Sequence, residues 1–177
     1  MHALSTEARP QLIGQVKSIQ VRLGITATLV VAADQVSKAL AVAKLENGEP
    51  INVLGPVLKL SFARNPGAAF SFATSATLLF TVLAASACVG IIWFSRKIVS
   101  PPWAVVFGAI LGGALGNLID RVFRSPQNFQ GHVVDFIELP NYPIFNLADS
   151  AIFCATIGGI ILTMRAINIT EKQSDDS

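Results

Sequence analysis

Four long apolar runs, separated by polar segments, dominate the hydropathy pattern of this chain. A helix needs about 20 mostly apolar residues to span the hydrocarbon core of a bilayer. The runs of that length lie near residues 23–43, 76–94, 103–122 and 146–167. The pattern therefore predicts an all-α membrane bundle of four transmembrane helices, forming a single integral membrane domain over residues 1–177.

The first run is the least regular of the four, because charged and polar residues interrupt it. Lys17 and Arg22 precede it, and Ala41-Val-Ala43 resembles a cleavage site, as in a secretory signal peptide. Asp34 and Lys38 are unusual inside such a signal. We therefore expect a retained helix, with cleavage as the alternative.

The two long connections contain a period-2 pattern, which is typical of strands. Leu58, Leu60 and Phe62 alternate with polar residues, and a β-branched run occupies residues 131–137. We expect these segments to form a short extracytoplasmic β-sheet on the membrane surface. The connections that contribute to it are residues 44–75 and 123–143.

Basic residues predict the orientation of the helices, because cytoplasmic loops are enriched in Lys and Arg. Arg96-Lys97 fills the short connector between the second and third runs, on the same side as both chain ends. The basic residues on this side are Arg9, Lys17, Arg22, Arg96, Lys97, Arg165 and Lys172, against Lys44, Lys59, Arg64, Arg121 and Arg124 on the other. We expect cytoplasmic termini, with residues 1–20 as a polar N-terminal extension and residues 170–177 as a flexible tail.

Composition narrows the class of protein. Apolar residues make up 52% and charged residues only 14% of the chain, about half the charged share usual for soluble domains. The net charge of +2 is too small to argue for a nucleic-acid partner. Cys88 and Cys154 lie inside apolar runs, which favours buried structural roles. His2 and His132 are too few for a histidine-based metal cage, and we expect neither a metal nor a cofactor.

Three aspartates fall at the predicted outer ends of the third and fourth runs: Asp120, Asp135 and Asp149. The first and last each close an Asn-x-x-Asp tetrad, with Asn117 and Asn146, and this spacing places each Asn on the same helix face as its Asp. Carboxylates beside hydrocarbon are costly and persist mainly where they pair, bind an ion or do chemistry. The sequence therefore predicts an acidic site at the outer membrane face.

Two of these carboxylates could hydrolyse a peptide bond if they lie close together. A close pair retains a proton near neutral pH. Its ionised member can then activate water, and its protonated member can polarise the scissile carbonyl. A purely structural alternative is that Asp149 caps the fourth helix and Asp120 pairs with Arg121. The residues alone leave open which two aspartates would act.

Other polar residues have mainly structural interpretations. Asp34 and Lys38, spaced i, i+4, are expected to form an ion pair, with a Ser37–Lys38 or Ser71–Lys38 nucleophile and base as the alternative. His132 and Glu138 are expected on the surface of a loop. The third run carries a row of glycines that predicts close helix packing: Gly108, Gly112, Gly113 and Gly116.

An ion-coupled transporter and a non-enzymatic assembly factor remain alternative functions.

Five stretches, taken in order, resemble the lipoprotein signal peptidase family, also called signal peptidase II, which are bacterial membrane aspartyl peptidases. They are Asp34-Gln-Val-Ser-Lys38, Asn65-Pro-Gly-Ala-Ala-Phe70, Gly112-Gly-Ala-Leu-Gly-Asn-Leu-Ile-Asp-Arg121, Gly131-His-Val-Val-Asp-Phe136 and Phe145-Asn-Leu-Ala-Asp-Ser150. Two features depart from the family pattern: Pro66 replaces a residue that is often Thr, and the stretch 122–130 is longer than in many members. The extension before Leu23 lies outside the resemblance.

The resemblance implies a fold, a reaction and a set of site residues. It implies four transmembrane helices with an extracytoplasmic β-cradle, and a catalytic pair formed by Asp135 and Asp149. The implied substrates are diacylglyceryl-modified prolipoproteins, which are cut just before the lipidated cysteine without the help of a metal. The protein is expected to be a monomer in the bacterial cytoplasmic membrane, in contact with membrane lipids. The implied supporting or substrate-binding residues are Asp34, Lys38, Asn65, Gly67, Asn117, Asp120, Arg121, Asn146 and Ala148.

Overall fold

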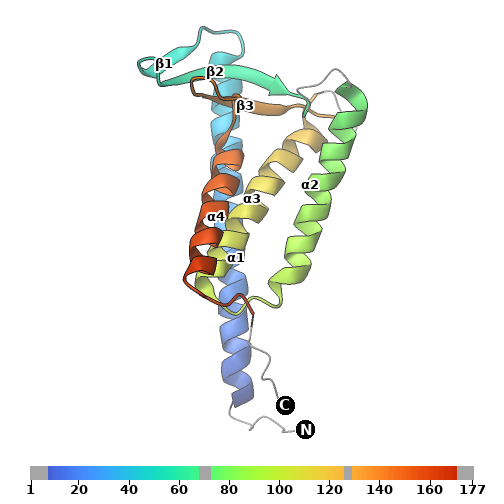
Figure 1. Ribbon diagram of the computed structural model, residues 1–177. Coiled ribbons are helices and arrows are strands. Elements are labelled where there is room, and N and C mark those ends of the chain that lie inside the picture. The colour runs from blue at the N-terminus through green and yellow to red at the C-terminus, as the bar shows by residue number, and fades with distance from the viewer. Residues whose placement is uncertain (1–7, 68–72, 126–128, 171–177) are drawn as a thin grey trace.

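Four helices stand side by side and a small sheet lies across one end of them (Figure 1). The computed structural model describes residues 8–67, 73–125 and 129–170, apart from the side chains of 8–16 and 73–76. The elements in chain order are α1 (Ala8–Leu45), β1 (Ile51–Leu54), β2 (Leu58–Asn65), α2 (Ala73–Ser95), α3 (Pro101–Phe123), β3 (Val133–Glu138) and α4 (Leu147–Met164).

All four helices are long and apolar enough to cross a membrane, which confirms the predicted membrane bundle. Their outward-facing side chains are largely apolar: Leu29, Val89 and Trp93 are each about two-thirds exposed, as expected for surfaces that contact lipid tails. The first helix is longer than predicted. It begins at Ala8 and therefore includes residues 8–20 of the segment predicted to be a polar N-terminal extension.

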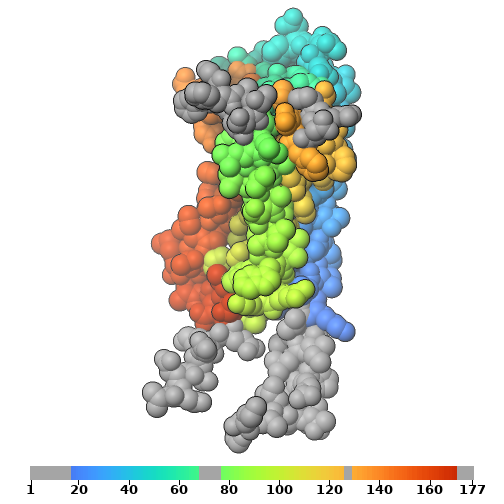
Figure 2. All heavy atoms as spheres, turned by 90° about the vertical axis from the view of Figure 1, so that its right-hand side faces the viewer, coloured from blue at the N-terminus to red at the C-terminus, as the bar shows by residue number. Residues whose placement is uncertain are grey.

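The helix α3 occupies the centre of the bundle, and its glycines explain why. It packs against α1, α2 and α4. Added Cβ atoms at Gly108 and Gly112 would each lie 2.7 Å from a carbonyl oxygen of α1, and one at Gly113 would collide with α4. The predicted role of the glycine row in close packing is therefore confirmed. Figure 2, which views the molecule from the α2 side, shows α2 in front of this packed core.

The sheet is antiparallel with the order β1-β2-β3. The strands expected around residues 58–62 and 131–137 are both present, whereas β1 was not anticipated. The register places Ala63 of β2 opposite Asp135 of β3. One face of the sheet packs on the end of α1, where Val134 and Phe136 contact Ala41 and Leu45.

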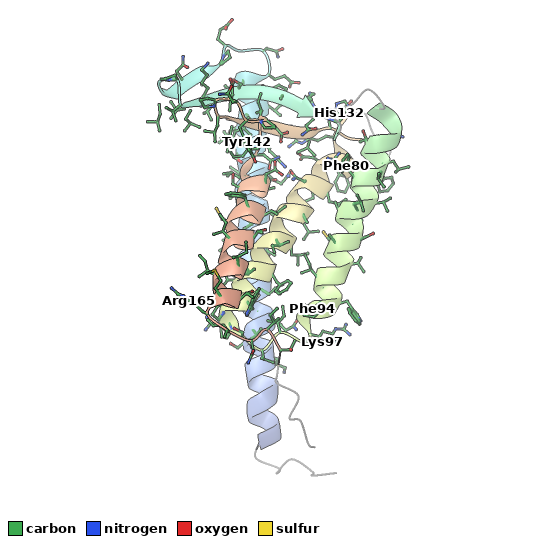
Figure 3. All side chains as sticks on the ribbon, viewed as in Figure 1. Phe80, Phe94, Lys97, His132, Tyr142 and Arg165 are labelled. Atoms are coloured by element: carbon green, nitrogen blue, oxygen red, sulfur yellow. The ribbon has the colours of Figure 1, made fainter. Side chains whose placement is uncertain are left out.

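We call the end of the bundle that carries the strands the sheet end, and the opposite end the terminal end. The start of α1 and the end of α4 both lie at the terminal end (Figure 1). Lys97 and Arg165 also lie there, whereas His132 and Tyr142 lie at the sheet end (Figure 3). Both long connections therefore lie at the end opposite to the start of α1 and the end of α4, and which of the two ends faces the cytoplasm stays a prediction from the basic residues.

Two expectations about individual side chains are wrong. Cys88 is buried as predicted, but Cys154 is exposed on α4, because the apolar run faces outward there. Glu138 is part of β3 rather than a loop charge, and its carboxylate accepts a hydrogen bond from the Ser61 hydroxyl.

Candidate active site

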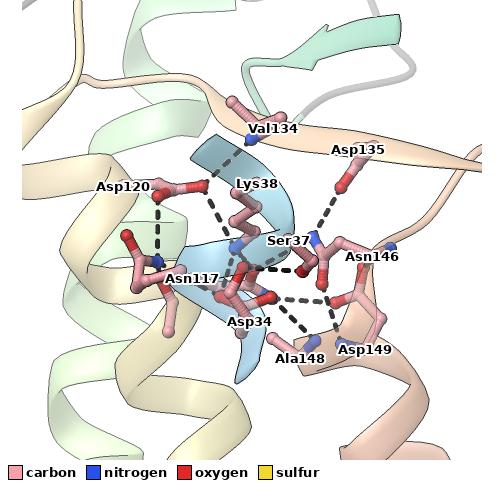
Figure 4. A network of polar contacts seen from close by, with 12 residues as sticks. Asp34, Ser37, Lys38, Asn117, Asp120, Val134, Asp135, Asn146, Ala148 and Asp149 are labelled. Carbon is pink, nitrogen blue, oxygen red and sulfur yellow. Dashed lines mark hydrogen bonds and ion pairs between the residues drawn. The ribbon is translucent and has the colours of Figure 1, made fainter. Parts of the chain in front are cut away.

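Polar side chains from α1, α3, β3 and α4 converge beneath the sheet, at the sheet end of the bundle (Figure 4). Asp34, Lys38, Asp120 and Asn146 are fully buried there, and Asp135 is almost so. Every buried polar side-chain atom in the described part of the chain has a hydrogen-bond partner. The acidic site predicted from the sequence is therefore a satisfied internal network rather than a set of isolated charges.

Lys38 is the only cation fully buried within the described residues, and it joins α1 to α3. Its Nζ lies 2.8 Å from Asp34 Oδ2, 3.1 Å from Asp120 Oδ2 and 2.9 Å from Asn117 Oδ1. The predicted ion pair with Asp34 is confirmed, and Asp120 extends it. These three contacts use the three donors of an ammonium group.

This network leaves the alternative nucleophile pair without support. The Ser37 hydroxyl donates to the backbone carbonyl of Asp34 at 2.8 Å, while the Lys38 ammonium is held by its own three partners. Ser71, the other serine considered, lies outside the described residues.

Asp120 connects the end of α3 to β3. Its Oδ2 accepts the backbone N–H of Val134 at 3.0 Å, and its Oδ1 accepts Arg124 Nε at 2.7 Å. Asp120 pairs with Arg124 rather than with Arg121, the partner in the structural alternative, because neighbouring helix residues point in different directions, whereas Arg124 is one turn away. Both carboxylate oxygens of Asp120 are thus occupied by bonds that hold the network together.

Asp34 makes a similar connection to the start of α4. Its Oδ1 accepts the backbone N–H of Ala148 at 2.9 Å. Gly116 makes room for it, because an added Cβ there would lie only 2.5 Å from Asp34 Oδ2. Ala148 is fully buried at this contact, so the small residue permits α1, α3 and α4 to meet closely.

Asp149 both caps α4 and belongs to the network. Asn146 and Asp149 form a reciprocal capping box, in which the Asn146 side chain accepts the backbone N–H of Asp149 at 2.9 Å and the Asp149 side chain accepts the backbone N–H of Asn146 at 3.3 Å. Asn117 Nδ2 donates to Asp149 Oδ1 at 2.8 Å. The capping interpretation of Asp149 is therefore correct, and it leaves the carboxylate positioned at the sheet end.

Asp135 projects from β3 towards the same place. Asn65 Nδ2 donates to its Oδ2 at 2.8 Å, and Asn146 Nδ2 donates to its Oδ1 at 2.6 Å. Burial raises the pKa of Asp135 to about 6, with a further increase from the negative charge of Asp149, although the Asn65 and Asn146 hydrogen bonds oppose the change. Asp135 therefore holds a proton at higher pH than an ordinary carboxyl group.

Asn146 joins the two carboxyl groups. Its side chain donates to Asp135, while its backbone N–H donates to Asp149. Among the described residues, Asp135 and Asp149 make no direct hydrogen bond with each other. The pair expected from the sequence is thus assembled through a shared asparagine, which differs from the directly shared hydrogen that a close pair would hold.

Arg121 and the turn after β2 form the wall of the site nearest α2. Gly67 adopts φ +92°, a left-handed conformation that favours glycine, and its N–H donates to Asn65 Oδ1 at 2.8 Å. An added Cβ at Gly67 would lie 2.8 Å from the ring of Phe80 and 3.1 Å from the Arg121 guanidinium. The structure thus brings all eleven residues implied by the resemblance to the sheet end.

Several contributors were not singled out from the sequence. Gln35 Nε2 donates to Asp34 Oδ2 at 3.1 Å and to Asp120 Oδ1 at 3.2 Å, and Arg124 neutralises the other side of Asp120. The i, i+4 spacing of Asp120 and Arg124 is the sequence pattern that could have indicated this ion pair. His132 is half-buried, and burial together with the charges of Arg64 and Arg121 lowers its pKa.

An apolar groove of about 400 Å³ opens beside Asp149. Its lining combines the segment after β3 with the outward face of α4: Leu139, Tyr142, Phe145, Asp149, Ser150, Phe153 and Cys154. One carboxylate of the pair therefore borders a surface suited to hydrocarbon. Within the described part of the chain, no group of three His, Cys, Asp or Glu side chains is placed to hold a metal ion.

The chain matches a family model described as signal peptidase (SPase) II over residues 26–167. A lipoprotein signal peptidase of Rhodococcus jostii is 47% identical over 142 residues, which cover 80% of this chain and 72% of that protein. One from Streptomyces coelicolor is 52% identical over 132 residues, covering 75% and 65%. One from Leifsonia xyli is 40% identical over 171 residues, covering 96% and 79%.

Two solved structures of a bacterial membrane enzyme, determined by the in meso method, have a similar fold. The one at 1.9 Å resolution superposes with a TM-score of 0.71 and 30% identity, covering 80% of this chain and 91% of that chain. The one at 2.3 Å resolution gives 0.67 and 30% identity, covering 85% and 93%.

Proposed function

The chain belongs to the signal peptidase II family of proteases, and from this premise we propose that it is an aspartyl endopeptidase of diacylglyceryl-modified prolipoproteins. It would remove the signal peptide by cutting just before the lipidated cysteine. The observation that carries the proposal is the arrangement of Asp135 and Asp149 around Asn146, at the end of a membrane bundle.

The proposed reaction assigns different roles to the two carboxyl groups. Asp149 lies in the first turn of α4, at the positive end of the helix dipole, and its carboxylate accepts two N–H hydrogen bonds, so it is the proposed proton acceptor of the pair. Asp135 has a pKa raised to about 6 by burial and by the nearby charge, so it is the better proton donor. Asp149 therefore removes a proton from the attacking water, while Asp135 donates a hydrogen bond to the scissile carbonyl oxygen.

Completion of the reaction returns both groups to their starting state. Attack of the water oxygen on the carbonyl carbon gives a tetrahedral intermediate, whose oxyanion takes the Asp135 proton. Collapse of this intermediate breaks the C–N bond, and the proton held by Asp149 passes to the leaving nitrogen of the lipidated cysteine. Asp135 then recovers its proton from the hydroxyl of the intermediate as the new carboxyl group forms.

The surroundings of the pair support a lipid-linked substrate. The groove beside Asp149 presents aromatic and aliphatic side chains at the level where α4 begins, continuous with the exposed apolar face of that helix. A diacylglyceryl group could remain in the bilayer while the peptide meets the carboxylates. We propose cytoplasmic termini and an extracytoplasmic site, on the basis of Arg96, Lys97 and Arg165 at the terminal end.

A cleavage assay with the purified protein tests this function. A synthetic prolipoprotein peptide carrying a diacylglyceryl cysteine is compared with the same peptide without lipid, each with and without a metal chelator. We expect signal-peptide release from the lipidated peptide only, unaffected by chelator. Equal cleavage of both peptides would contradict the proposed substrate class, and loss of cleavage with chelator would contradict the aspartyl mechanism.

A further inference from the structure

None of the described side chains of α2 belongs to the carboxylate network, yet this helix reaches both connections at the sheet end through two buried threonines. Thr77 and Thr81 lie one turn apart and are 1% and 4% exposed. The Thr77 hydroxyl donates to the Pro66 carbonyl at 2.6 Å, and the Thr81 hydroxyl donates to the Phe129 carbonyl at 2.8 Å. Each bond joins α2 to a segment outside the helix.

These bonds leave the helix, although the Thr81 hydroxyl also contacts the Thr77 carbonyl of α2 at 2.9 Å. Thr26, Thr156 and Thr163 each donate to the carbonyl four residues earlier in their own helix, which is the usual local bond of a helical threonine. Thr77 donates to the Pro66 carbonyl in the turn that follows β2, eleven residues earlier in the chain. Its hydroxyl therefore links α2 to the wall of the candidate active site.

The Pro66 carbonyl is the point at which this turn is held. Proline has no N–H, so it cannot fix the turn by donating a bond. Its carbonyl accepts from Thr77 and, at a longer 3.4 Å, from Arg121 Nη1. The adjoining Gly67 N–H then occupies Asn65 Oδ1, which orients Asn65 Nδ2 towards Asp135 Oδ2 at 2.8 Å. A continuous path of three hydrogen bonds, the Pro66–Gly67 peptide unit and the Asn65 side-chain amide thus runs from Thr77 to Asp135.

We propose that Thr77 is a positioning residue for the carboxylate pair: by holding the Pro66 carbonyl, it keeps the Asn65 amide against Asp135. The proposal rests on the proposed function for its effect on cleavage, but its structural part concerns Asp135 alone. Among the hydrogen bonds described for the Pro66 carbonyl, the one that remains without the hydroxyl is the long contact from Arg121. Asn65 then loses its fixed orientation, and Asp135 loses a donor that favours its ionised form.

Two variants remove the hydroxyl and one retains it. Thr77→Val keeps the shape of the side chain, Thr77→Ala favours the helix, and Thr77→Ser keeps the donor. Thr156→Val is the matched control, because its hydroxyl bonds only within α4 and lies away from the site. Protonation of Asp135 is followed in the purified protein by the infrared carboxyl band that is lost in Asp135→Asn, and cleavage is measured over the same pH range.

We expect the titration of Asp135 to move to higher pH in Thr77→Val and Thr77→Ala, and kcat to fall about 10- to 100-fold. Thr77→Ser should restore both, and Thr156→Val should change neither. An unmoved Asp135 titration in the folded removal variants would overturn the positioning role, whether or not the protein cleaves the peptide. Failure of both removal variants to fold, with Thr77→Ser folded, would assign Thr77 to stability and overturn it too. Absence of cleavage by the unaltered protein would count against the proposed function only.

Discussion

Lys38 shows how strongly one side chain can be constrained inside a membrane bundle. Its ammonium lies between Asp34 and Asp120, with no exposed surface on any of the three. Taking these charges out of water costs several kcal/mol per ion, and the cost is offset only while every member keeps its partners. Removal of the Lys38 charge should therefore destabilise the protein more than the loss of a surface ion pair would.

Lys38→Met should destabilise the protein by about 3–5 kcal/mol, because two buried carboxylates would face each other without their shared cation. Lys44→Met is the matched control: it changes an exposed lysine on the same helix, and should alter stability by no more than about 0.5 kcal/mol. Thermal unfolding in detergent measures both. Equal melting temperatures for the two variants would show that the buried cluster contributes little.

The raised pKa of Asp135 has a consequence for stability as well as for its proposed role in catalysis. An ordinary aspartate has a pKa of 3.8, and the folded value is about 6, so the folded protein binds this proton more tightly than the unfolded chain does. The contribution of Asp135 is therefore fully present below about pH 4 and is lost as the pH rises through about 6. The full change corresponds to about 3 kcal/mol.

Asp135→Asn should remove this pH dependence. We expect the melting temperature of the unaltered protein, relative to that of Asp135→Asn, to fall between pH 4 and pH 7. Comparing the two proteins at each pH cancels the titration of the groups that do not interact with Asp135. Parallel melting curves across this range would contradict a raised pKa for Asp135.

Single residues were predictable from the sequence where their partners are local. The Asp34–Lys38 pair and the Asn146–Asp149 cap follow from i, i+4 and i, i+3 spacing. The bond from Ala148 N–H to Asp34 joins residues 114 positions apart, and no local pattern indicates it. The choice of Asp135 rather than Asp120 as a partner for Asp149 came from the family resemblance, because both carboxylates satisfied the same argument from burial.

At the scale of elements, α3 holds the bundle together because its glycines permit backbone contact. Gly112 faces the Ala27 carbonyl of α1, whereas Gly90 of α2 has open space where a Cβ would lie. The two positions have the same residue type and helical conformation, and differ in their neighbours.

Gly112→Ala should therefore lower the melting temperature, because the new methyl group forces α1 and α3 apart. Gly90→Ala should be neutral or stabilising by up to about 1 kcal/mol, since alanine favours the helix and meets nothing. The comparison is made by thermal unfolding in the same detergent. A variant at Gly112 as stable as the one at Gly90 would contradict close α1–α3 packing.

Hydropathy located the four helices but not all of their ends or the full sheet. The start of α1 at Ala8 extends beyond the apolar run, because a polar sequence can continue a helix that the membrane segment has already nucleated. The strand β1 is not indicated by the sequence pattern, because all four of its residues are exposed and buried and exposed positions do not alternate along it. Its place is determined by pairing with β2.

At the scale of the whole molecule, the bundle has apolar side chains on its outer surface and a polar network buried at one end. The helices expose aliphatic and aromatic side chains and bury charges at one end. The sheet covers this end, and the groove beside Asp149 leaves one side open to an apolar ligand. Water, a lipid-linked peptide and two carboxyl groups can meet at such a place.

The central claim is that Asp135 and Asp149 carry out the hydrolysis. Single-turnover cleavage of the diacylated peptide by Asp135→Asn and Asp149→Asn tests it most directly, with Glu49→Gln as a control that changes an exposed acid on the sheet side. We predict that each aspartate variant folds and loses about a thousand-fold in rate, while the control retains full activity. A folded variant at either position that cleaves at the rate of the unaltered protein would contradict the account.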